Sequence, residues 1–398
     1  MSQAAAMAGT PVPSGFSLLY VATVSWTVLS FLLPYAAHFR ALGWRVDAAA
    51  SGASSNAALR DAFDHVYELP LSRSILDVDG FVRGERAISK VLASGPDIVH
   101  VHTPIASFIT RFAAARIPAG RRPMLAYTAH GFHFHRDGNP VTNAPFLAAE
   151  RLAGRWTDRL IVINDEDYEA AQRHRIVAPG HLVRMPGIGI DTDVFSRSSI
   201  RPDAFASARR ELGTGPDTPL FVVVGELNRN KRTDDAIEAL ALMRHTEARL
   251  VLVGPGRQAR LEELVIRRGL RDRVRFTGLV NDVRPVVGSA TALVLPSKRE
   301  GLARSIMEAL ALEVPVIAST ARGNRELVGD DGGLIVPTGD VRRFAAAMDS
   351  LVDHPAERLE MGRCGRLRMV EQYDLRNLLR LHEEMYGGML AARSKRVT

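Results

Sequence analysis

The sequence predicts an α/β protein with two domains, each built around a parallel β-sheet. Its opening predicts a strand at residues 17–24, a helix at 29–42 that ends at Gly43, and a second strand at 44–50. A β-α-β succession implies parallel strands joined by right-handed crossovers. With 398 residues the chain is long enough for two domains that each bury a core of their own.

Strand and helix patterns continue to alternate along the chain. In the first domain, further strands are expected at residues 97–102, 123–128, 159–163 and 182–184. In the second, they are expected at 250–253, 274–278 and 291–296. Asp340 is expected to begin a helix that runs to about Val352, and Asp165 to Asp167 to serve another helix start, where acidic residues complement the helix dipole. A last helix is expected from Arg376 onward.

Composition excludes several classes of protein. Hydrophobic residues make up 46% and charged residues 24% of the chain, as in soluble globular proteins. Cys364 is the only cysteine, which excludes a disulfide framework and a cysteine-based zinc site and fits a reducing cytoplasm. Residues 1–15 lack the Lys or Arg that starts a signal peptide. The apolar run 16–37 contains Ser, Thr and Pro34, so it fits a strand, a turn and a buried helix better than a membrane span.

The net charge of +7 is concentrated near the end of the chain, where basic residues outnumber acidic ones after Arg363. An anionic membrane surface and a solvated helix end explain this excess equally well. No aromatic residues are interleaved with the basic ones and no recognition motif is visible, so no nucleic-acid partner is expected.

The most informative segment is residues 295–308, which holds the carboxylates Glu300 and Glu308. It follows the expected strand 291–296, and its apolar residues then recur at helical spacing. Glu300 and Gly301 should therefore lie in the turn, and Glu308 about two turns into the helix. The N–H groups of Leu302 and Ala303 should lie at the helix start, where they and the helix dipole favour a phosphate. Carboxylates on both sides of such a phosphate site suit a sugar nucleotide.

The pattern Glu300-Gly-Leu-(x)5-Glu308 resembles the E-x7-E signature of retaining glycosyltransferases of family 4. That family has the GT-B fold, in which two Rossmann-like domains face each other across a cleft and the C-terminal helix crosses back to the first domain. The resemblance covers nearly the whole chain after Phe16. It implies an acceptor-side domain at residues 1–194, completed by 374–398, and a nucleotide-sugar domain at 195–373. In the family, the residue at Glu300 contacts the donor sugar and the residue at Glu308 binds the ribose.

A second motif lies at the start of the second domain, where the family has Gly-Arg-Leu-(x)3-Lys. Gly225 and Lys231 match it, and the resemblance implies that Lys231 grips the donor diphosphate. The Arg position holds Glu226, which reverses a charge, and Arg229 could supply the missing cation. The family's Gly-Gly pair in the first turn of the chain is replaced by residues 25–27, Ser-Trp-Thr.

The stretch 127–135 contains His130, His133 and His135. It resembles a turn of the family's first domain from which one His, matching His130, points toward the donor sugar. With the flanking segments 101–105 and 163–168, it is similar to the exopolysaccharide and capsule branch. For His133 and His135 we expect packing and local hydrogen bonds. The family also implies that Gly254, and Gly278 with Leu279, line the nucleobase.

Two further patterns in the sequence are typical of other kinds of site. His100 and His102 form the His-x-His pattern of metal-dependent hydrolases, but no convincing carboxylate or lysine ligands accompany them, so no metal site is expected. The G-x-G-x-x-A match that begins at Gly254 is typical of dinucleotide sites. Such a site needs an acidic residue at the end of the next strand, and the strand 274–278 provides none.

We therefore expect a retaining, metal-independent glycosyltransferase without a cofactor. Its expected donor is a UDP-hexose or UDP-N-acetylhexosamine, and its acceptor a glycan or a polyprenyl-diphosphate-linked sugar. It should be cytoplasmic, with peripheral contact at the inner face of the cytoplasmic membrane. Two alternatives stay open: a GT-B nucleotide-sugar epimerase or hydrolase, and a catalytically silent sugar-nucleotide binding protein, which Glu226 and the altered first turn both allow.

Overall fold

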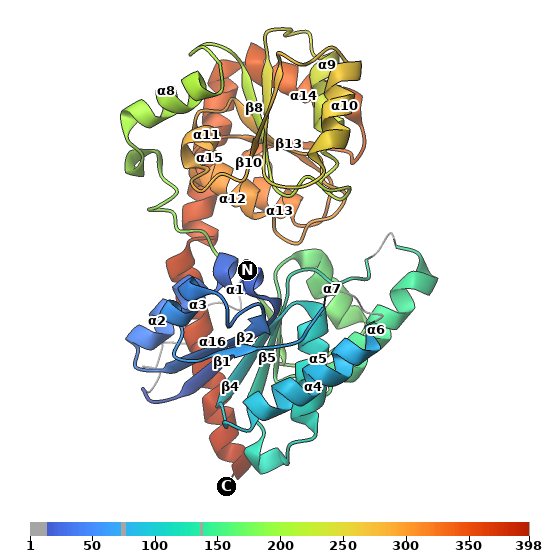
Figure 1. Ribbon diagram of the computed structural model, residues 1–398, viewed down its shortest axis with the longest axis vertical. Coiled ribbons are helices and arrows are strands. Elements are labelled where there is room, and N and C mark those ends of the chain that lie inside the picture. Colours follow the sequence, from blue (N-terminus) through green and yellow to red (C-terminus); the bar gives the residue numbers. More distant parts are fainter. Residues whose placement is uncertain (1–13, 73–76, 136–137, 398) are drawn as a thin grey trace. The chain divides into compact units, whose positions relative to one another are not determined.

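The computed structural model describes residues 14–72, 77–135 and 138–397 (Figure 1). The chain forms two compact units. One extends to Gly187 and includes the chain from Leu378 onward, and the other spans Ile188–Asn377. Residues 188–194 and 374–377, which were expected in the first domain, belong to the second unit.

The first unit contains a seven-stranded parallel sheet in the order β3-β2-β1-β4-β5-β6-β7. Its strands are β1 Ser17–Val24, β2 Arg45–Ser51, β3 Val66–Glu68, β4 Ile98–His102, β5 Met124–Ala129, β6 Arg159–Val162 and β7 Leu182–Arg184. Its helices are α1 Ser25–Phe31, α2 Leu33–Ala41, α3 Ala57–Ala62, α4 Val78–Leu92, α5 Pro104–Ala115, α6 Pro140–Gly154 and α7 Asp165–Arg173. The short edge strand β3 was not predicted from the sequence.

The expected first helix is two helices in the structure. Helix α1 begins directly after β1, and α2 follows after Leu32 with Pro34 in its first turn. Proline suits the first turn of a helix but cannot continue one, because it lacks an N–H group. The prediction of a single helix starting at residue 29 was therefore wrong at its start and missed the break.

The second unit contains a six-stranded parallel sheet in the order β10-β9-β8-β11-β12-β13. Its strands are β8 Leu220–Val224, β9 Arg249–Val253, β10 Val274–Gly278, β11 Ala292–Leu295, β12 Val316–Ser319 and β13 Gly333–Val336. Its helices are α8 Pro202–Glu211, α9 Thr233–Leu242, α10 Gln258–Arg267, α11 Arg284–Gly288, α12 Arg304–Ala311, α13 Asn324–Val328, α14 Val341–Asp353 and α15 Pro355–Gln372. The expected helix at Asp340 is confirmed, since the Asp340 carboxylate caps α14 by accepting from the Arg343 N–H.

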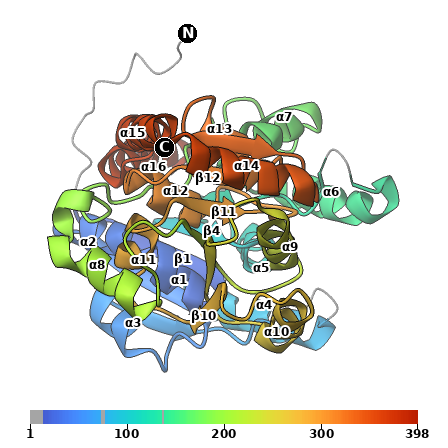
Figure 2. The same cartoon turned by 90° about the horizontal axis from the view of Figure 1, so that it is seen from above.

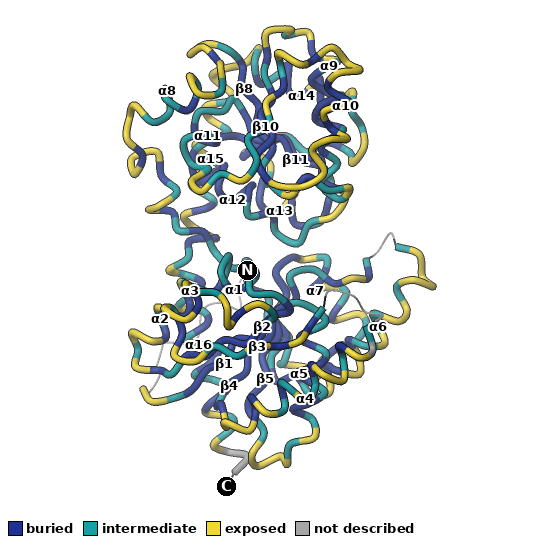
Figure 3. The backbone as a smooth tube through the Cα atoms, viewed as in Figure 1, coloured by how far each residue is buried: buried dark blue, intermediate teal, exposed yellow. Residues whose placement is uncertain are grey.

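Each sheet is covered on both faces, as a parallel sheet requires. In the second unit, α9, α10 and α14 pack on one face, and α11, α12 and α13 on the other (Figure 2). The strands β1, β4, β5, β8, β11 and β12 are buried along nearly their whole length (Figure 3). This burial explains why β8 and β11 appear in the sequence as continuous apolar runs rather than as alternating patterns.

The last helix, α16 Leu375–Val397, returns to the first unit, as predicted. The carboxylate of Glu383 lies 2.6 Å from His38 Nε2 on α2. The hydroxyl of Tyr386 lies 2.5 Å from His100 Nδ1 on β4 and 3.5 Å from the Tyr20 hydroxyl on β1. Helix α16 therefore completes the core of the first unit, and the expected α/β fold with two Rossmann-like domains is confirmed.

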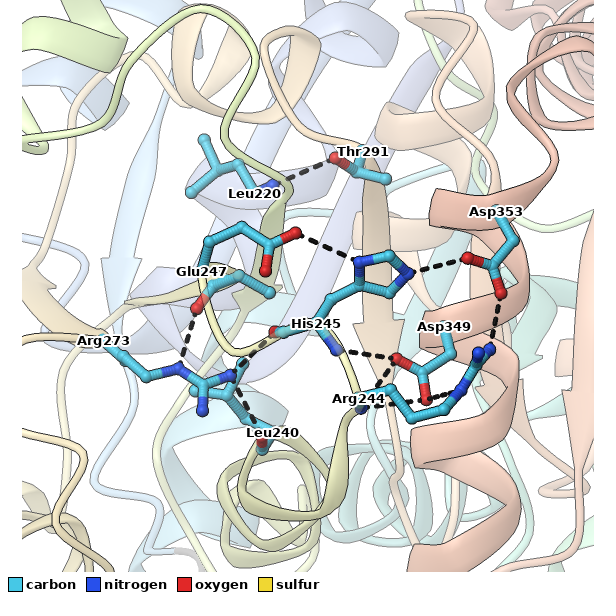
Figure 4. A network of polar contacts seen from close by, with 10 residues as sticks. Leu220, Leu240, Arg244, His245, Glu247, Arg273, Thr291, Asp349 and Asp353 are labelled. Carbon is cyan, nitrogen blue, oxygen red and sulfur yellow. Dashed lines mark hydrogen bonds and ion pairs between the residues drawn. The ribbon is translucent and has the colours of Figure 1, made fainter.

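A polar network fastens the loop after α9 to α14 in the second unit (Figure 4). The buried Asp349 carboxylate accepts hydrogen bonds from the backbone N–H groups of Arg244, at 3.1 Å, and His245, at 3.4 Å. His245 Nε2 lies 2.7 Å from Asp353, and its Nδ1 lies 3.1 Å from Glu247. These carboxylates raise the pKa of His245 above its usual value, with the hydrogen bond to Asp353 as the largest cause.

Candidate functional site

Lysine and glutamate side chains meet at the carboxyl edge of the second sheet. Lys231 lies in the connection that follows β8, and Glu300 in the turn that follows β11, the neighbouring strand. Lys231 Nζ donates to Glu300 Oε1 at 2.8 Å, and the two side chains are only 19% and 12% exposed. Ligands of open parallel sheets bind at the carboxyl ends of the strands. The structure thus brings together two of the residues predicted for the donor site.

Short hydrogen bonds hold these two connections in place. The side-chain oxygen of Asn228 accepts from the N–H groups of Asn230, at 3.0 Å, and Lys231, at 3.1 Å. Asn230 then bonds the other connection, because its amide donates to the Arg299 carbonyl at 2.9 Å and its carbonyl accepts from the Lys298 N–H at 2.7 Å. These hydrogen bonds from Asn228 and Asn230 fix the two connections and so position Lys231 relative to Glu300.

Glycines allow the neighbouring turns to approach closely. A Cβ atom on Gly225 would lie 3.1 Å from Lys231 Cε, so the lysine stem crosses directly over this residue. A Cβ atom on Gly254 would lie 2.1 Å from the Gly225 carbonyl oxygen, and one on Gly323 would lie 1.7 Å from the Gly301 carbonyl oxygen. All three glycines have positive φ angles. Gly254 thus has a packing role in addition to the base contact predicted for it.

The turn after β10 contains the other two residues predicted for the nucleobase. Gly278 has a φ of 66°, and its carbonyl accepts from the Gly254 N–H at 2.8 Å. Leu279 follows with 66% of its surface exposed. An exposed leucine beside these turns at the carboxyl edge can offer an apolar contact, and the base-binding role remains a prediction.

Helix α12 begins later than predicted. Ala303 is its N-cap and Arg304 its first residue, so Leu302 lies before the helix, and the first helical N–H groups belong to Arg304 and Ser305. Glu308 is therefore about one turn into the helix rather than two. The apolar spacing alone could not locate the start, because Leu302 and Ala303 continue the helical pattern without being helical.

Glu308 is buried, with 8% of its surface exposed. Burial raises the pKa of its carboxyl above the usual value, and the neighbouring Arg304 opposes that rise. Arg304 Nε donates to Glu308 Oε1 at 2.8 Å, one helical turn away. Arg304 was not among the predicted site residues, although its position four residues before Glu308 was a visible signal for such a pair.

Glu226, which stands where the family has Arg, and Arg229, which could supply the missing positive charge, are both exposed. Neither side chain makes a hydrogen bond or an ion pair with the described part of the chain. The Glu226 carbonyl accepts from the Asn228 N–H at 2.8 Å, so the turn keeps its form without using the glutamate side chain. Arg229 remains uncommitted two residues from Lys231, which leaves its predicted role with the diphosphate as a prediction.

In the first unit, His130 follows β5 directly, and its Nε2 lies 3.0 Å from Nδ1 of His102 at the end of β4. Burial lowers the pKa of His130 to about 4, so its ring is neutral at neutral pH. The loop beyond it is held by the buried Asp167, whose carboxylate accepts from the Phe132 N–H at 3.4 Å and from the Asn164 side chain at 2.7 Å. Asp167 was predicted only to serve a helix start, where it does lie, and its contact with the Phe132 loop was not predicted.

Two further histidines of the first unit have side-chain partners, and His135 accepts a hydrogen bond from the Asn143 side chain through its carbonyl, at 2.9 Å. His100 Nε2 lies 2.7 Å from the Thr128 hydroxyl, and its Nδ1 faces Tyr386 of α16. His133 stacks on Phe146 with ring centroids 5.2 Å apart, in agreement with the packing expected for it. Within the described ranges, no group of three or more His, Cys, Asp or Glu residues is placed to hold a metal ion.

A largely apolar cavity of about 700 Å³ lies at the carboxyl ends of β1 and β4 in the first unit. Phe81, Phe108 and Phe146 contribute to its lining, together with Thr23 and Thr103. Thr103 has a φ of 71°, which is rare and strained for a β-branched residue, and its hydroxyl lies 2.7 Å from that of Thr23. Among the described residues, the lining includes the carboxylates of Asp77 and Glu150 and no Lys or Arg, so the cavity does not favour an anionic group.

A larger cavity of about 1110 Å³ in the second unit is a weaker candidate. Its lining includes Pro219, Thr291 and Pro315, which precede β8, β11 and β12. It therefore lies at the amino ends of the strands, away from Lys231 and Glu300. Parallel sheets bind ligands at the opposite edge.

The basic excess near the C-terminus is largely engaged in local contacts. Arg393 pairs with Asp97 of the first unit, and Arg380 with Glu384, at 2.6 Å. Arg363, Arg366, Arg368 and Arg376 also bond carboxylates or backbone carbonyls. These contacts weaken the predicted cationic patch. Among the helices of the described chain, none has both the length and the apolar character needed to cross a membrane.

Comparisons with known proteins agree with this geometry. A family model described as Glycosyltransferase Family 4 matches residues 31–194, and one described as Glycosyl transferases group 1 matches residues 205–368. A protein of Bacillus subtilis (strain 168), provisionally named glycosyltransferase EpsD, is 33% identical over 88% of this chain and 91% of its own. An Escherichia coli protein, UDP-Gal:alpha-D-GlcNAc-diphosphoundecaprenol alpha-1,3-galactosyltransferase, is 26% identical over 65% of this chain and 66% of its own.

Solved structures share the fold. HepE of Anabaena, determined with UDP, matches with a TM-score of 0.75 and 18% identity over 94% of this chain and 100% of its own. Sucrose-phosphate synthase of Thermosynechococcus elongatus matches with a TM-score of 0.79 and 21% identity over the same shares. At these identities the likeness shows the two-domain architecture alone.

Proposed function

The chain belongs to glycosyltransferase family 4, and from this membership we propose that it transfers a sugar from a nucleotide sugar to an acceptor with retention of the anomeric configuration. The donor is a UDP-hexose or UDP-N-acetylhexosamine, as the names of the E. coli relative and of the HepE complex suggest. The EpsD relative supports a role in exopolysaccharide or capsule synthesis.

The observation that carries this proposal is the pairing of Lys231 with Glu300 at 2.8 Å. In a nucleotide sugar, the anomeric carbon is bonded directly to the diphosphate through one oxygen. A cation and a carboxylate side by side fit the two halves of that link, because the cation attracts the phosphate and the carboxylate accepts hydrogen bonds from sugar hydroxyls.

The same residues account for the chemistry. Negative charge develops on the diphosphate as the bond to the anomeric carbon breaks. Lys231 and the N-terminus of α12 place positive charge beside that leaving group, which is the form of stabilisation that contributes most to many enzymes. On this account, the leaving group needs no metal ion. Retention would follow from attack on the face that the leaving group departs from.

The remaining site residues keep their predicted roles within this proposal. Glu308 accepts hydrogen bonds from the ribose, Gly278 and Leu279 contact the base, and Arg229 adds positive charge near the diphosphate. From the first unit, His130 hydrogen-bonds the donor sugar. The support for these roles is the match of each residue to the family motif, together with the burial of Glu308 and the neutral ring of His130.

For the acceptor, we propose a glycan or a polyprenyl-diphosphate-linked sugar reached at the inner face of the cytoplasmic membrane. The apolar cavity beside Thr103 offers space for an uncharged part of such a substrate. Trp26 in the altered first turn has 61% of its surface exposed, which also fits an apolar partner. Membrane contact should be weak, because most basic side chains near the C-terminus are already paired.

A screen of nucleotide sugars by thermal shift tests the donor, since a ligand that binds only the folded protein raises its melting temperature. The donor that stabilises best is then incubated with acceptors, and NMR of the anomeric centre of the product is recorded. Retention supports the proposal, and an epimerised or hydrolysed donor without transfer indicates the GT-B epimerase or hydrolase. Stabilisation without turnover indicates a silent binding protein. If EDTA abolishes activity and a divalent metal restores it, the metal-free account is wrong.

A further inference from the structure

We propose that His102 fixes the tautomer of His130, so that His130 presents an N–H donor, through Nδ1, to the substrate. The inference rests on the proposed function only in naming a sugar oxygen as the group that receives this hydrogen bond. It makes His102 a positioning residue, since it acts through His130 and does not itself touch substrate.

The first step is the number of protons on the two rings. His102 is 3% exposed, and burial lowers its pKa well below the usual value, as burial also does for His130. Neutral histidine carries one N–H group and one acceptor nitrogen. Because His102 Nδ1 and His130 Nε2 are 3.0 Å apart, one of them must donate and the other must accept.

The second step is the outer nitrogen of His102. Its Nε2 is buried and has no hydrogen-bond partner among the described residues. If this nitrogen carried the proton, a buried N–H donor would be left without an acceptor, which is rare in folded proteins and costs a large part of its hydration energy. Placing the proton on Nδ1 uses it in the hydrogen bond to His130. This assignment makes His102 the donor.

The third step follows at His130. Its Nε2 accepts the hydrogen bond from His102, so its single proton is on Nδ1. No described residue bonds that Nδ1, and the Phe31 ring lies on one side of the imidazole with centroids 6.0 Å apart. His130 can then donate to a sugar oxygen but cannot take a proton at Nδ1. It is a binding group and not a general base.

The surroundings contain little that could reverse this assignment. The ring of His102 packs against His100 of β4, with centroids 4.3 Å apart, and against Tyr20 of β1, at 5.9 Å. The remaining titratable neighbour that affects the pKa of His102 is His382 of α16, whose own pKa burial lowers to about 4. None of these groups brings a fixed charge to the pair.

The direct test is nitrogen-15 NMR of the full-length protein labelled on histidine, because the shifts of Nδ1 and Nε2 report which nitrogen is protonated. His130→Gln identifies the His130 signals. We expect protonated Nδ1 and unprotonated Nε2 on His130 at neutral pH, and the opposite pattern overturns the proposal. This readout needs no activity, so it separates failure of the tautomer assignment from failure of the proposed function.

Three substitutions add a functional readout. His102→Asn can still donate from a similar position and should keep most of the activity, whereas His102→Leu removes the donor and should lower kcat by roughly tenfold. His102→Asp offers only an acceptor, so it should move the His130 proton to Nε2 and depress activity at neutral pH. As the pH falls and His130 gains a second proton, Nδ1 becomes a donor again and the rate of this variant should recover. A general loss of structure would not recover in acid, so an Asp variant with a flat pH profile contradicts the proposal.

Discussion

Replacing Glu308 with glutamine should weaken binding of the nucleotide sugar without destabilising the protein. Glutamine keeps the size of the side chain and one acceptor oxygen but removes the charge. Hydrogen bonds to charged groups contribute about 1.5–3 kcal/mol, against about 0.5–1.5 kcal/mol for neutral ones. The expected loss is therefore about 1–1.5 kcal/mol, or roughly tenfold in Kd. The ion pair lost with Arg304 contributes less than about 1 kcal/mol, because Arg304 is 41% exposed.

The pH dependence of binding gives the sharper form of this test. Because burial raises the pKa of Glu308, its charge is lost at a higher pH than that of an ordinary carboxylate. Donor affinity of the wild type should thus fall as the pH is lowered through this raised pKa, and the Glu308→Gln variant should lack that fall. Arg304→Gln removes the cation that opposes the rise, so it should move the fall to higher pH.

The assay is isothermal titration calorimetry with the nucleotide sugar that stabilises the protein best. A free nucleoside diphosphate is unsuitable, because its terminal phosphate titrates near pH 6 and would mask Glu308. Melting temperatures of both variants serve as the control for folding. Equal affinity of wild type and Glu308→Gln at every pH, with normal melting, would refute the ribose role and the reasoning from burial.

Three further predictions address other parts of the chain. Lys231→Ala should lower kcat and diphosphate affinity together, by roughly tenfold or more each. Lys231→Arg keeps the charge, so both its kcat and its affinity should fall less. Unchanged affinity in the alanine variant would show that Lys231 does not bind the diphosphate. Neutralising Lys395 and Arg396 should reduce co-sedimentation with anionic vesicles at low salt, at about 1 kcal/mol per charge, and equal recovery with neutral vesicles contradicts membrane contact. His245→Asn should lower the free energy of unfolding by up to about 1 kcal/mol below about pH 6.5, where the raised pKa of His245 gives its full contribution. The loss should become smaller as the pH rises through that pKa. If urea unfolding shows the same loss at acid and alkaline pH, the ion pair with Asp353 does not contribute to stability.

Most of the fold could be predicted because parallel strands leave a strong signal. Strand β1 was placed at its observed bounds, since a strand buried on both faces is apolar along most of its length. The edge strand β3 was missed because it has three residues, of which none is fully buried. The break between α1 and α2 was missed for a different reason. The apolar pattern continues through Leu32, and only the geometry shows that Pro34 starts a new helix.

The candidate site was predicted as a set of residues but not as an arrangement. Motifs identified Lys231 and Glu300, yet their 2.8 Å contact depends on the Asn230 bridge to Arg299, between residues far apart in sequence. The pairing of His102 with His130 was equally out of reach, because it requires β4 and β5 to be adjacent. Sequence motifs report residue types, whereas tautomers and pKa shifts depend on which groups the fold brings into contact.

The turn that contains Glu226 explains how the chain tolerates a reversed charge at this position. Its backbone carbonyl bonds the Asn228 N–H, and Leu227 is buried and pairs with Gly256, so the turn is held by groups that do not depend on the side chain at this position. The exposed glutamate therefore leaves Lys231 in place. A negative side chain near a diphosphate would raise its Kd unless a cation compensates, and Arg229 is the exposed, uncommitted cation in the same turn. The structure thus separates the two consequences of the substitution, because the geometry of the site is preserved while its electrostatics must be restored by another residue.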